Sequence, residues 1–248
     1  MESSEPTGPI SHGGALISGV LSGAGFAHGF TLRASDPSAR EASDLDLDTV
    51  FTVKQVHGAG VVTATGTPAS MRGEKADAIV LAQGQTGAIR VADCVPVLVG
   101  DAATGRAAAI HAGWRGVVSG VIPAALASMR GKPGDMVAAV GPCIEACCFE
   151  VGEEVADQIE SAAPVPGVVV RRASVDGRAK AWVDLVTAVR AQLEACGVLP
   201  TNVERVGGCT MCDIVLPPQA GGPPMPRFHS FRRDGAGAGR MFGVITAR

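Results

Sequence analysis

Short runs of branched apolar residues recur along most of the chain, separated by Gly, Pro, Asp and Thr positions. Runs of this length that are rich in Val and Ile are typical of strands inside a domain, whereas helices need longer stretches. The pattern therefore predicts strands at residues 50–53, 61–63, 78–81, 88–91, 95–99, 107–110, 137–140, 168–170 and 203–206.

Two longer stretches have the length of helices. Residues 117–130 run up to Gly131, and residues 182–196 run up to Gly197. Glycine is common directly after a helix because it adopts the left-handed conformation at no steric cost. A weaker helical stretch covers residues 152–161. Strands interrupted by helices without strict alternation predict an α/β (α+β) fold with mixed β-sheets.

The predicted organisation is one domain behind an N-terminal arm. Residues 1–25 are rich in Gly, Ser and Pro, so we expect a flexible arm there, with one short strand at 15–20. Residues 26–248 are expected to form a single catalytic domain. Within it, the Gly- and Pro-rich residues 217–226 predict a loop.

The composition narrows the class of protein. With 248 residues, 46% of them hydrophobic, the chain can bury a large core. It has no stretch of about 18 uninterrupted apolar residues, and its first residues lack the basic and apolar regions of a secretion signal. Seven cysteines, an odd number, favour a reducing compartment over a disulfide framework. We therefore expect a cytoplasmic protein with no membrane partner.

The charge pattern argues against a nucleic-acid partner. The net charge is −3, and aromatic residues make up only 4% of the chain, with no Tyr. Nucleic-acid binders usually carry a basic surface with interleaved aromatic residues. We therefore expect a small-molecule partner instead.

Candidate chemistry begins with His57, Cys94 and His111, each of which lies in a short apolar-flanked segment that ends in a tight turn. Two imidazoles and one thiolate suit Zn²⁺, and three protein ligands leave a fourth position open for water or substrate. Any one of the three, taken alone, fits a buried core residue better. Their coincidence in a chain with only five histidines favours a metal centre.

The segments around these residues resemble the signature blocks of the YfiH-type family. The family is also called the laccase domain family, the peptidoglycan editing factor family and the zinc-dependent purine nucleoside phosphorylases. The resemblance covers nearly the whole chain from about His28. Its blocks are Gln55-Val56-His57-Gly58, Ala92-Asp93-Cys94-Val95-Pro96, Ile110-His111-Ala112-Gly113-Trp114-Arg115-Gly116, Gly141-Pro142-Cys143-Ile144, Cys147-Cys148-Phe149-Glu150-Val151, Asp184-Leu185, Gly208-Cys209-Thr210, Ser230-Phe231-Arg232-Arg233-Asp234 and Gly239-Arg240-Met241.

The resemblance implies a layered α-β-β-α arrangement and a homodimer. It also implies a zinc-dependent purine nucleoside phosphorylase that acts on adenosine, inosine and methylthioadenosine and has adenosine deaminase activity. The expected partners are purine nucleosides and phosphate, and the expected cofactor is Zn²⁺.

Two residues near the metal ligands are candidates for contact with substrate. Arg115 lies four residues after His111, close to a predicted helix start where anions are favoured, and its guanidinium suits a phosphate clamp with a catalytic role. Gln55 points to the same side as His57 if the segment is extended, so we expect it to hydrogen-bond substrate.

Asp93 and Arg33 complete the predicted site. Asp93 is the candidate general acid or base, because it directly precedes Cys94. Arg33 matches an arginine of the family and is a candidate phosphate or ribose contact. The Gly-Gly turn that follows this arginine in the family is absent here, where Ala34 and Ser35 follow it.

Two further clusters carry chemistry that this site does not use. Arg232, Arg233 and Arg240, with His229 and Ser230, form a basic cluster of the kind that more often marks a solvated face than a pocket.

The other cluster is made of cysteines. Cys209 and Cys212 form a C-x-x-C pair, and Cys143 with Cys147 or Cys148 would supply the other half of a four-thiolate zinc site. The spacing of the second half is unusual, so this site is a secondary hypothesis. A redox role is disfavoured because no thioredoxin-like context surrounds the pair.

Other functions can be weighed on the same residues. A multicopper oxidase needs several paired imidazoles, and the chain has no His-x-His pair, which disfavours copper oxidase chemistry. One alternative is a cysteine hydrolase or amidase, with Cys94 as a nucleophile activated by His111, acting on cytoplasmic peptidoglycan precursors. Another is a non-enzymatic metal-binding module.

Overall fold

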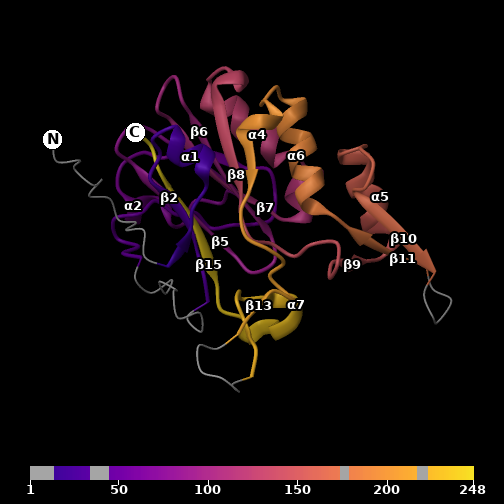
Figure 1. Ribbon diagram of the computed structural model, residues 1–248. Helices are drawn as coiled ribbons and strands as arrows, with labels where there is room; N and C mark the ends of the chain where they lie inside the picture. The colour runs from indigo at the N-terminus through magenta and orange to yellow at the C-terminus, as the bar shows by residue number, and fades with distance from the viewer. Residues whose placement is uncertain (1–13, 34–44, 174–178, 217–222) are drawn as a thin grey trace.

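The computed structural model describes residues 14–33, 45–173, 179–216 and 223–248 (Figure 1). At its centre lies a six-stranded sheet in the order β12-β8-β6-β7-β4-β3. The pairs β12·β8 and β3·β4 are parallel and the inner pairs are antiparallel, so the sheet is mixed. Its strands are β3 (Val61–Thr63), β4 (Ala78–Leu81), β6 (Val95–Asp101), β7 (Ala107–Ala112), β8 (Met136–Val140) and β12 (Val203–Arg205).

The inner strands β4, β6 and β7 are buried on both faces, which explains why they are continuous apolar runs in the sequence. Along β6, Val97 and Val99 belong to one hydrophobic core and Leu98 to a second core on the opposite face. In β7, Ile110 and Ala109 divide between the two cores in the same way. The alternation follows from the two-residue period of a strand.

A four-stranded antiparallel sheet packs against one face, in the order β1-β2-β15-β5. The shared core contains Phe30 from β2, Ile89 from β5 and Ile245 from β15. The strands are β1 (Ala15–Leu16), β2 (His28–Thr31), β5 (Thr86–Val91) and β15 (Met241–Thr246).

Helices cover the other face of the central sheet (Figure 1). They are α3 (Trp114–Val118), α4 (Val121–Met129), α5 (Glu153–Ala162) and α6 (Leu185–Ala195). The mixed-sheet α+β fold predicted from the sequence is therefore confirmed. No helix among the described residues is long and apolar enough to cross a bilayer.

The predicted helices differ from these in their ends. The stretch 117–130 is two helices, because Gly120 takes a left-handed conformation (φ 81°) between α3 and α4. The left-handed residue that ends α4 is Arg130 (φ 57°), not Gly131. The second helix begins only at Leu185, capped by the Asp184 side chain, since the residues before it belong to strand β11 (Ala179–Val183).

Shorter elements complete the chain. They are α1 (Gly19–Gly23), α2 (Pro68–Met71), β9 (Glu150–Val151), β10 (Val169–Ala173), β13 (Ile214–Val215), β14 (Met225–Pro226), α7 (Phe231–Asp234) and the 3₁₀ turns η2 (Pro133–Asp135), η3 (Pro200–Asn202) and η4 (Gly235–Gly237). The predicted strand at residues 50–53 is wrong, because this segment makes only one isolated bridge, from Phe51 to Gly87.

The predicted arm and loop lie partly outside the described residues. Residues 1–13 and 217–222 are not described. Residues 14–25 contain β1 and α1, and Leu21 of α1 is fully buried. The predicted strand at 15–20 is limited to Ala15–Leu16, because Ser18 caps helix α1 instead. The division into an arm and a single domain stays a prediction.

Candidate metal centre

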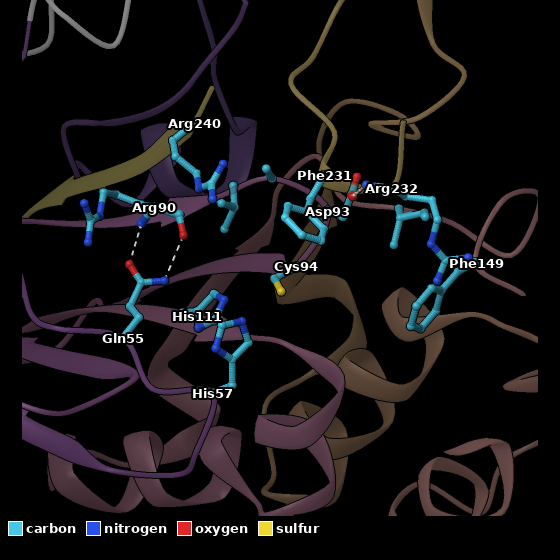
Figure 2. A pocket seen from close by; sticks show the side chains of 13 residues that line it. Gln55, His57, Arg90, Asp93, Cys94, His111, Phe149, Phe231, Arg232 and Arg240 are labelled. Carbon is cyan, nitrogen blue, oxygen red and sulfur yellow. Dashed lines mark hydrogen bonds between the residues drawn. The ribbon is translucent and has the colours of Figure 1, made fainter. Parts of the chain in front are cut away.

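Three segments that are distant in the sequence bring His57, Cys94 and His111 together. His57 lies in the loop before β3, Cys94 in the turn between β5 and β6, and His111 in β7, opposite Pro96 of β6. One donor atom from each lies within 4.8 Å of the other two. The two imidazole rings meet edge to face, with centroids 4.8 Å apart. Figure 2 shows the three side chains converging on one point.

Asp77, a residue that the sequence analysis missed, holds the His57 loop in place. Its fully buried carboxylate accepts hydrogen bonds from the backbone amides of Val56, His57 and Gly58, the last two at 2.9 and 2.7 Å. His57 has a left-handed backbone (φ 60°), which is costly for a residue with a side chain. The three amide bonds compensate for that cost and turn the imidazole toward Cys94.

The same carboxylate orients His111. The Nδ1 atom of His111 lies 2.8 Å from Asp77 Oδ1, and both side chains are buried. Because Nδ1 is engaged, Nε2 is the nitrogen left to face the centre, as in the carboxylate–histidine pairs of many zinc sites. The only sequence signal for this role is a charged residue directly before the wholly apolar run 78–81.

The surroundings of Cys94 lower the pKa of its thiol. Burial raises its pKa, but hydrogen bonds with His111 and His57 outweigh this effect and lower the pKa to about 7. Burial likewise disfavours the charged form of His111, yet its bonds to Asp77 and Cys94 raise the pKa to about 9. Burial also opposes ionisation of Asp77, and its bonds to His111 and to the loop amides lower its pKa nevertheless. The side chains form a polar chain of acid, imidazole and thiol.

One glycine keeps the space beside the donors open. A Cβ atom at Gly113 would lie 3.1 Å from the Cys94 sulfur and 3.2 Å from Cδ2 of His57. Any larger residue at this position would press against the side chains of Cys94 and His57. A group of three donors, as the described residues provide here, fits the open geometry of a catalytic zinc site.

The donors lie on one wall of a cavity of about 500 Å³. Its walls combine cationic and aromatic side chains: Arg90 and Arg240 lie on one side in Figure 2, and Phe149 and Arg232 on the other. Phe231, which is 54% exposed, also lines it. Of the predicted basic cluster, Arg232 and Arg240 therefore reach the cavity.

Two predicted site residues line the cavity with their polar groups already engaged. The Gln55 side-chain amide donates to the carbonyl and accepts from the amide of Arg90, both at 2.8 Å. The Asp93 carboxylate accepts from the Thr210 hydroxyl and from the backbone amide of Arg232, both at 2.6 Å. These two bonds tie the turn before Cys94 to Thr210 and Arg232, and the acid–base role of Asp93 stays a prediction.

Two predicted anion contacts lie elsewhere. Arg115 is exposed, stacks on the neighbouring Trp114 ring at 4.4 Å, and does not line the cavity. Arg33 pairs with Asp234 at 3.6 Å and does not line it either. The predicted roles of Arg115 and Arg33 in binding substrate stay predictions.

We expect alkylation of Cys94 in metal-free protein to rise with pH and to reach half of its maximal rate near pH 7. The thiolate is the reactive form, and the two imidazoles stabilise it. Peptide mapping after iodoacetamide treatment at a series of pH values measures this profile. Cys196 serves as the internal control, because burial raises its pKa. A Cys94 profile that coincides with that of Cys196 contradicts the electrostatic account.

The chain is similar in sequence to a known protein family and to characterised proteins. The family described as "Multi-copper polyphenol oxidoreductase laccase" matches residues 33–248. Purine nucleoside phosphorylase SCO2081 of Streptomyces coelicolor is 37% identical over 164 residues, which is 64% of this chain and 65% of that protein. Adenosine deaminase RL5 of an unknown prokaryotic organism is 36% identical over 173 residues, 68% of this chain and 61% of that protein. The chain thus spans less than two thirds of the length of both.

A solved structure extends the similarity to the whole fold. YlmD from Geobacillus stearothermophilus superposes with a TM-score of 0.75 at 25% identity, covering 96% of this chain and 98% of that one.

Proposed function

This chain belongs to the family described as multi-copper polyphenol oxidoreductase laccase, and on that premise we propose that it is a zinc-dependent purine nucleoside phosphorylase. The proposed substrates are adenosine, inosine and methylthioadenosine, with deamination of adenosine as a second activity. The observation that carries the proposal is the convergence of His57, Cys94 and His111 on one wall of a cavity lined by arginine and phenylalanine.

The donor set favours zinc over the copper of the family description. Two imidazoles and one thiolate that border a cavity suit an open zinc site. A multicopper oxidase requires several paired imidazoles, and the chain has five histidines with no His-x-His pair. When bound, the zinc ion supplies Lewis-acid polarisation of a ligand in the fourth position.

The cavity walls match the two substrates. A purine base presents a flat π surface, for which Phe231 and Phe149 offer stacking partners beside the metal ligands. Phosphate requires cationic donors, and Arg240 and Arg90 line the side opposite Phe149 (Figure 2). The Arg240 guanidinium donates through Nη1 to the carbonyls of Ala238 and Gly239, so its other nitrogen atoms are the ones offered to an anion. We assign the attacking phosphate to this side, where it would approach the ribose carbon while positive charge develops in the transition state.

Replacement of Arg240 by alanine should raise the phosphate KM by about tenfold, which corresponds to the loss of one partly exposed charge-assisted hydrogen bond. Deamination of adenosine without phosphate should change little, because that reaction uses no anion. The measurement is ribose 1-phosphate formed from inosine as phosphate is varied. The matched variant is Arg115→Ala. A larger rise of the phosphate KM in that variant would mean that Arg115 binds phosphate, as the sequence predicts, and would contradict the assignment of phosphate to Arg240.

The test of the function itself is a phosphate-dependence assay. Purified protein loaded with zinc is incubated with adenosine, inosine or methylthioadenosine, with and without phosphate. Free base that appears only with phosphate supports phosphorolysis, and inosine formed from adenosine without phosphate supports deamination. If neither product forms at any phosphate concentration, the proposal fails.

One observation favours a second candidate, a cysteine hydrolase. Cys94, His111 and Asp77 form the nucleophile, base and orienting acid of such an enzyme, joined by hydrogen bonds. This function would require no metal. Activity on amide substrates that persists in the metal-free protein and is lost on alkylation of Cys94 would select it over the phosphorylase.

A further inference from the structure

A second cluster of sulfur atoms lies outside the candidate metal centre. The side chains of Cys147, Cys148, Cys209 and Cys212 place their sulfur atoms within 4.8 Å of one another, and those of Cys147 and Cys212 are 3.6 Å apart. All four are free thiols. Nothing in the proposed function uses them.

Two tight turns of the backbone build this cluster. In one, the amides of Cys148 and Phe149 both donate to the carbonyl of Glu145, at 2.9 and 2.8 Å. In the other, the C-x-x-C turn closes with a bond from the amide of Asp213 to the carbonyl of Cys209. A parallel bridge between Cys143 and Cys209 holds the two turns side by side.

Cys143 itself is not part of the cluster, which corrects one half of the sequence-based hypothesis. Its side chain is fully buried, and burial raises its pKa to about 12. The backbone of Cys143 pairs with that of Cys209, whereas the side chains of Cys147 and Cys148 reach the sulfur atoms of the second turn.

The backbone around Cys209 is arranged to stabilise a sulfur anion. The amides of Glu145, Met211 and Cys212 all donate hydrogen bonds to its side chain. Amides two and three residues after the first cysteine of a C-x-x-C turn reach that cysteine's sulfur only when the turn is tightly wound. Such donors offset charge on a metal-bound thiolate.

Two guanidinium groups donate hydrogen bonds to the backbone carbonyls of the C-x-x-C segment. Arg205 binds Glu145 Oε1 at 2.7 Å and the carbonyl of Gly208 at 3.2 Å. Arg233 donates to the carbonyls of Thr210 and Met211, both at 3.1 Å. Each guanidinium is also paired with a carboxylate, Glu145 for Arg205 and Asp234 for Arg233, so the contribution of both arginines is to fix the backbone of the C-x-x-C segment.

We propose that Cys147, Cys148, Cys209 and Cys212 bind a second zinc ion in a closed, structural site. A tetrahedron of sulfur atoms around zinc has edges of about 3.8 Å, given Zn–S bonds of about 2.3 Å. The observed separations, 3.6 Å for one pair and at most 4.8 Å for the rest, require only a small contraction. Four thiolates select zinc over harder divalent ions, and they leave no position for water.

The site would brace the neighbouring catalytic turn. Thr210, inside the C-x-x-C turn, donates its hydroxyl to Asp93 at 2.6 Å, and Asp93 directly precedes Cys94. A left-handed backbone at Asp93 (φ 89°) makes this turn dependent on such anchors. Metal at the four-cysteine site therefore fixes Thr210, and through it the placement of Cys94.

The experiment counts zinc per chain in the purified full-length protein by elemental analysis. Wild-type protein should hold two zinc ions, one of which is lost in Cys212→Ser and the other in Cys94→Ala. Cys196→Ser, a thiol outside both clusters, should retain both. Replacement of zinc by Co²⁺ in the wild-type protein should give the intense thiolate charge-transfer bands of a four-sulfur site, and this measurement needs no variant to fold.

The outcomes separate this inference from the proposed function. One zinc per chain that is lost in Cys94→Ala and kept in Cys212→Ser overturns the four-cysteine site alone. One zinc that is lost in Cys212→Ser and kept in Cys94→Ala supports this site and overturns the catalytic metal. Iron in place of zinc also contradicts the inference. So does a disulfide between Cys147 and Cys212 in the wild-type protein, if Cys212→Ser has the same zinc content as the wild type.

Discussion

Replacement of Cys94 by alanine is expected to remove one zinc ion per chain and to reduce phosphorolysis and deamination together by about a thousandfold or more. Two imidazoles alone hold zinc weakly, because three protein ligands are the usual minimum for an open site. The lost Lewis acid accounts for several kcal/mol of transition-state stabilisation, and each 1.4 kcal/mol is about a tenfold change in rate. Elemental analysis and steady-state assays measure both effects.

The His57→Ala and His111→Ala variants should behave in the same way, since each removes one of the three converging donors. Cys196→Ala is the matched control, because its thiol lies near the end of α6, outside both cysteine-containing clusters. If Cys94→Ala keeps full zinc occupancy while losing activity, Cys94 acts as a nucleophile and the hydrolase is favoured.

Replacement of Asp77 by asparagine is expected to weaken zinc binding by about 10–100-fold, the usual cost of losing a carboxylate behind a histidine ligand. The carboxylate now accepts hydrogen bonds from the loop amides and from His111 Nδ1. The NH₂ group of asparagine cannot accept, so it would face one of these N–H groups with no bond between them. The free energy of unfolding should also fall by about 1–3 kcal/mol, because a buried donor loses its acceptor. Competition with a chelator and chemical denaturation measure the two effects.

Asp101→Asn provides the control for Asp77→Asn. Asp101 is also fully buried and also accepts backbone hydrogen bonds, from Ala103 and Thr104, but it lies at the far end of β6 from Cys94. This variant should lose stability without losing zinc affinity. Equal losses of zinc affinity in both variants would mean that general destabilisation, not the orientation of His111, explains the result.

The sequence predicted the central sheet well because burial on both faces leaves a local trace. Residues 78–81, 95–99 and 107–110 are unbroken apolar runs, and each lies in a strand between two cores. Prediction was weaker where the local pattern is shared by several conformations. Residues 117–130 read as one helix, and only the tertiary structure places Gly120 in a left-handed turn that divides it.

Strands β2 and β15 show the same limit. Neither was predicted, although Met241–Thr246 is largely apolar. Their pairing joins segments near opposite ends of the chain, with Gly243 opposite Phe30. No local pattern specifies such a partner, since the pairing depends on how the two sheets pack.

By itself, the sequence determined the donor chemistry of this protein: two imidazoles and a thiolate at strand ends, and a C-x-x-C pair beside further cysteines. The tertiary structure alone decided which groups meet. In the structure, Asp77 contacts His111, and Arg240 lines the cavity whereas Arg115 is exposed on α3. Cys147 and Cys148, not Cys143, lie beside Cys209 and Cys212. The reason is physical: residue type sets which bonds a side chain can form, but strand register and loop geometry set the few ångströms that decide whether it forms them.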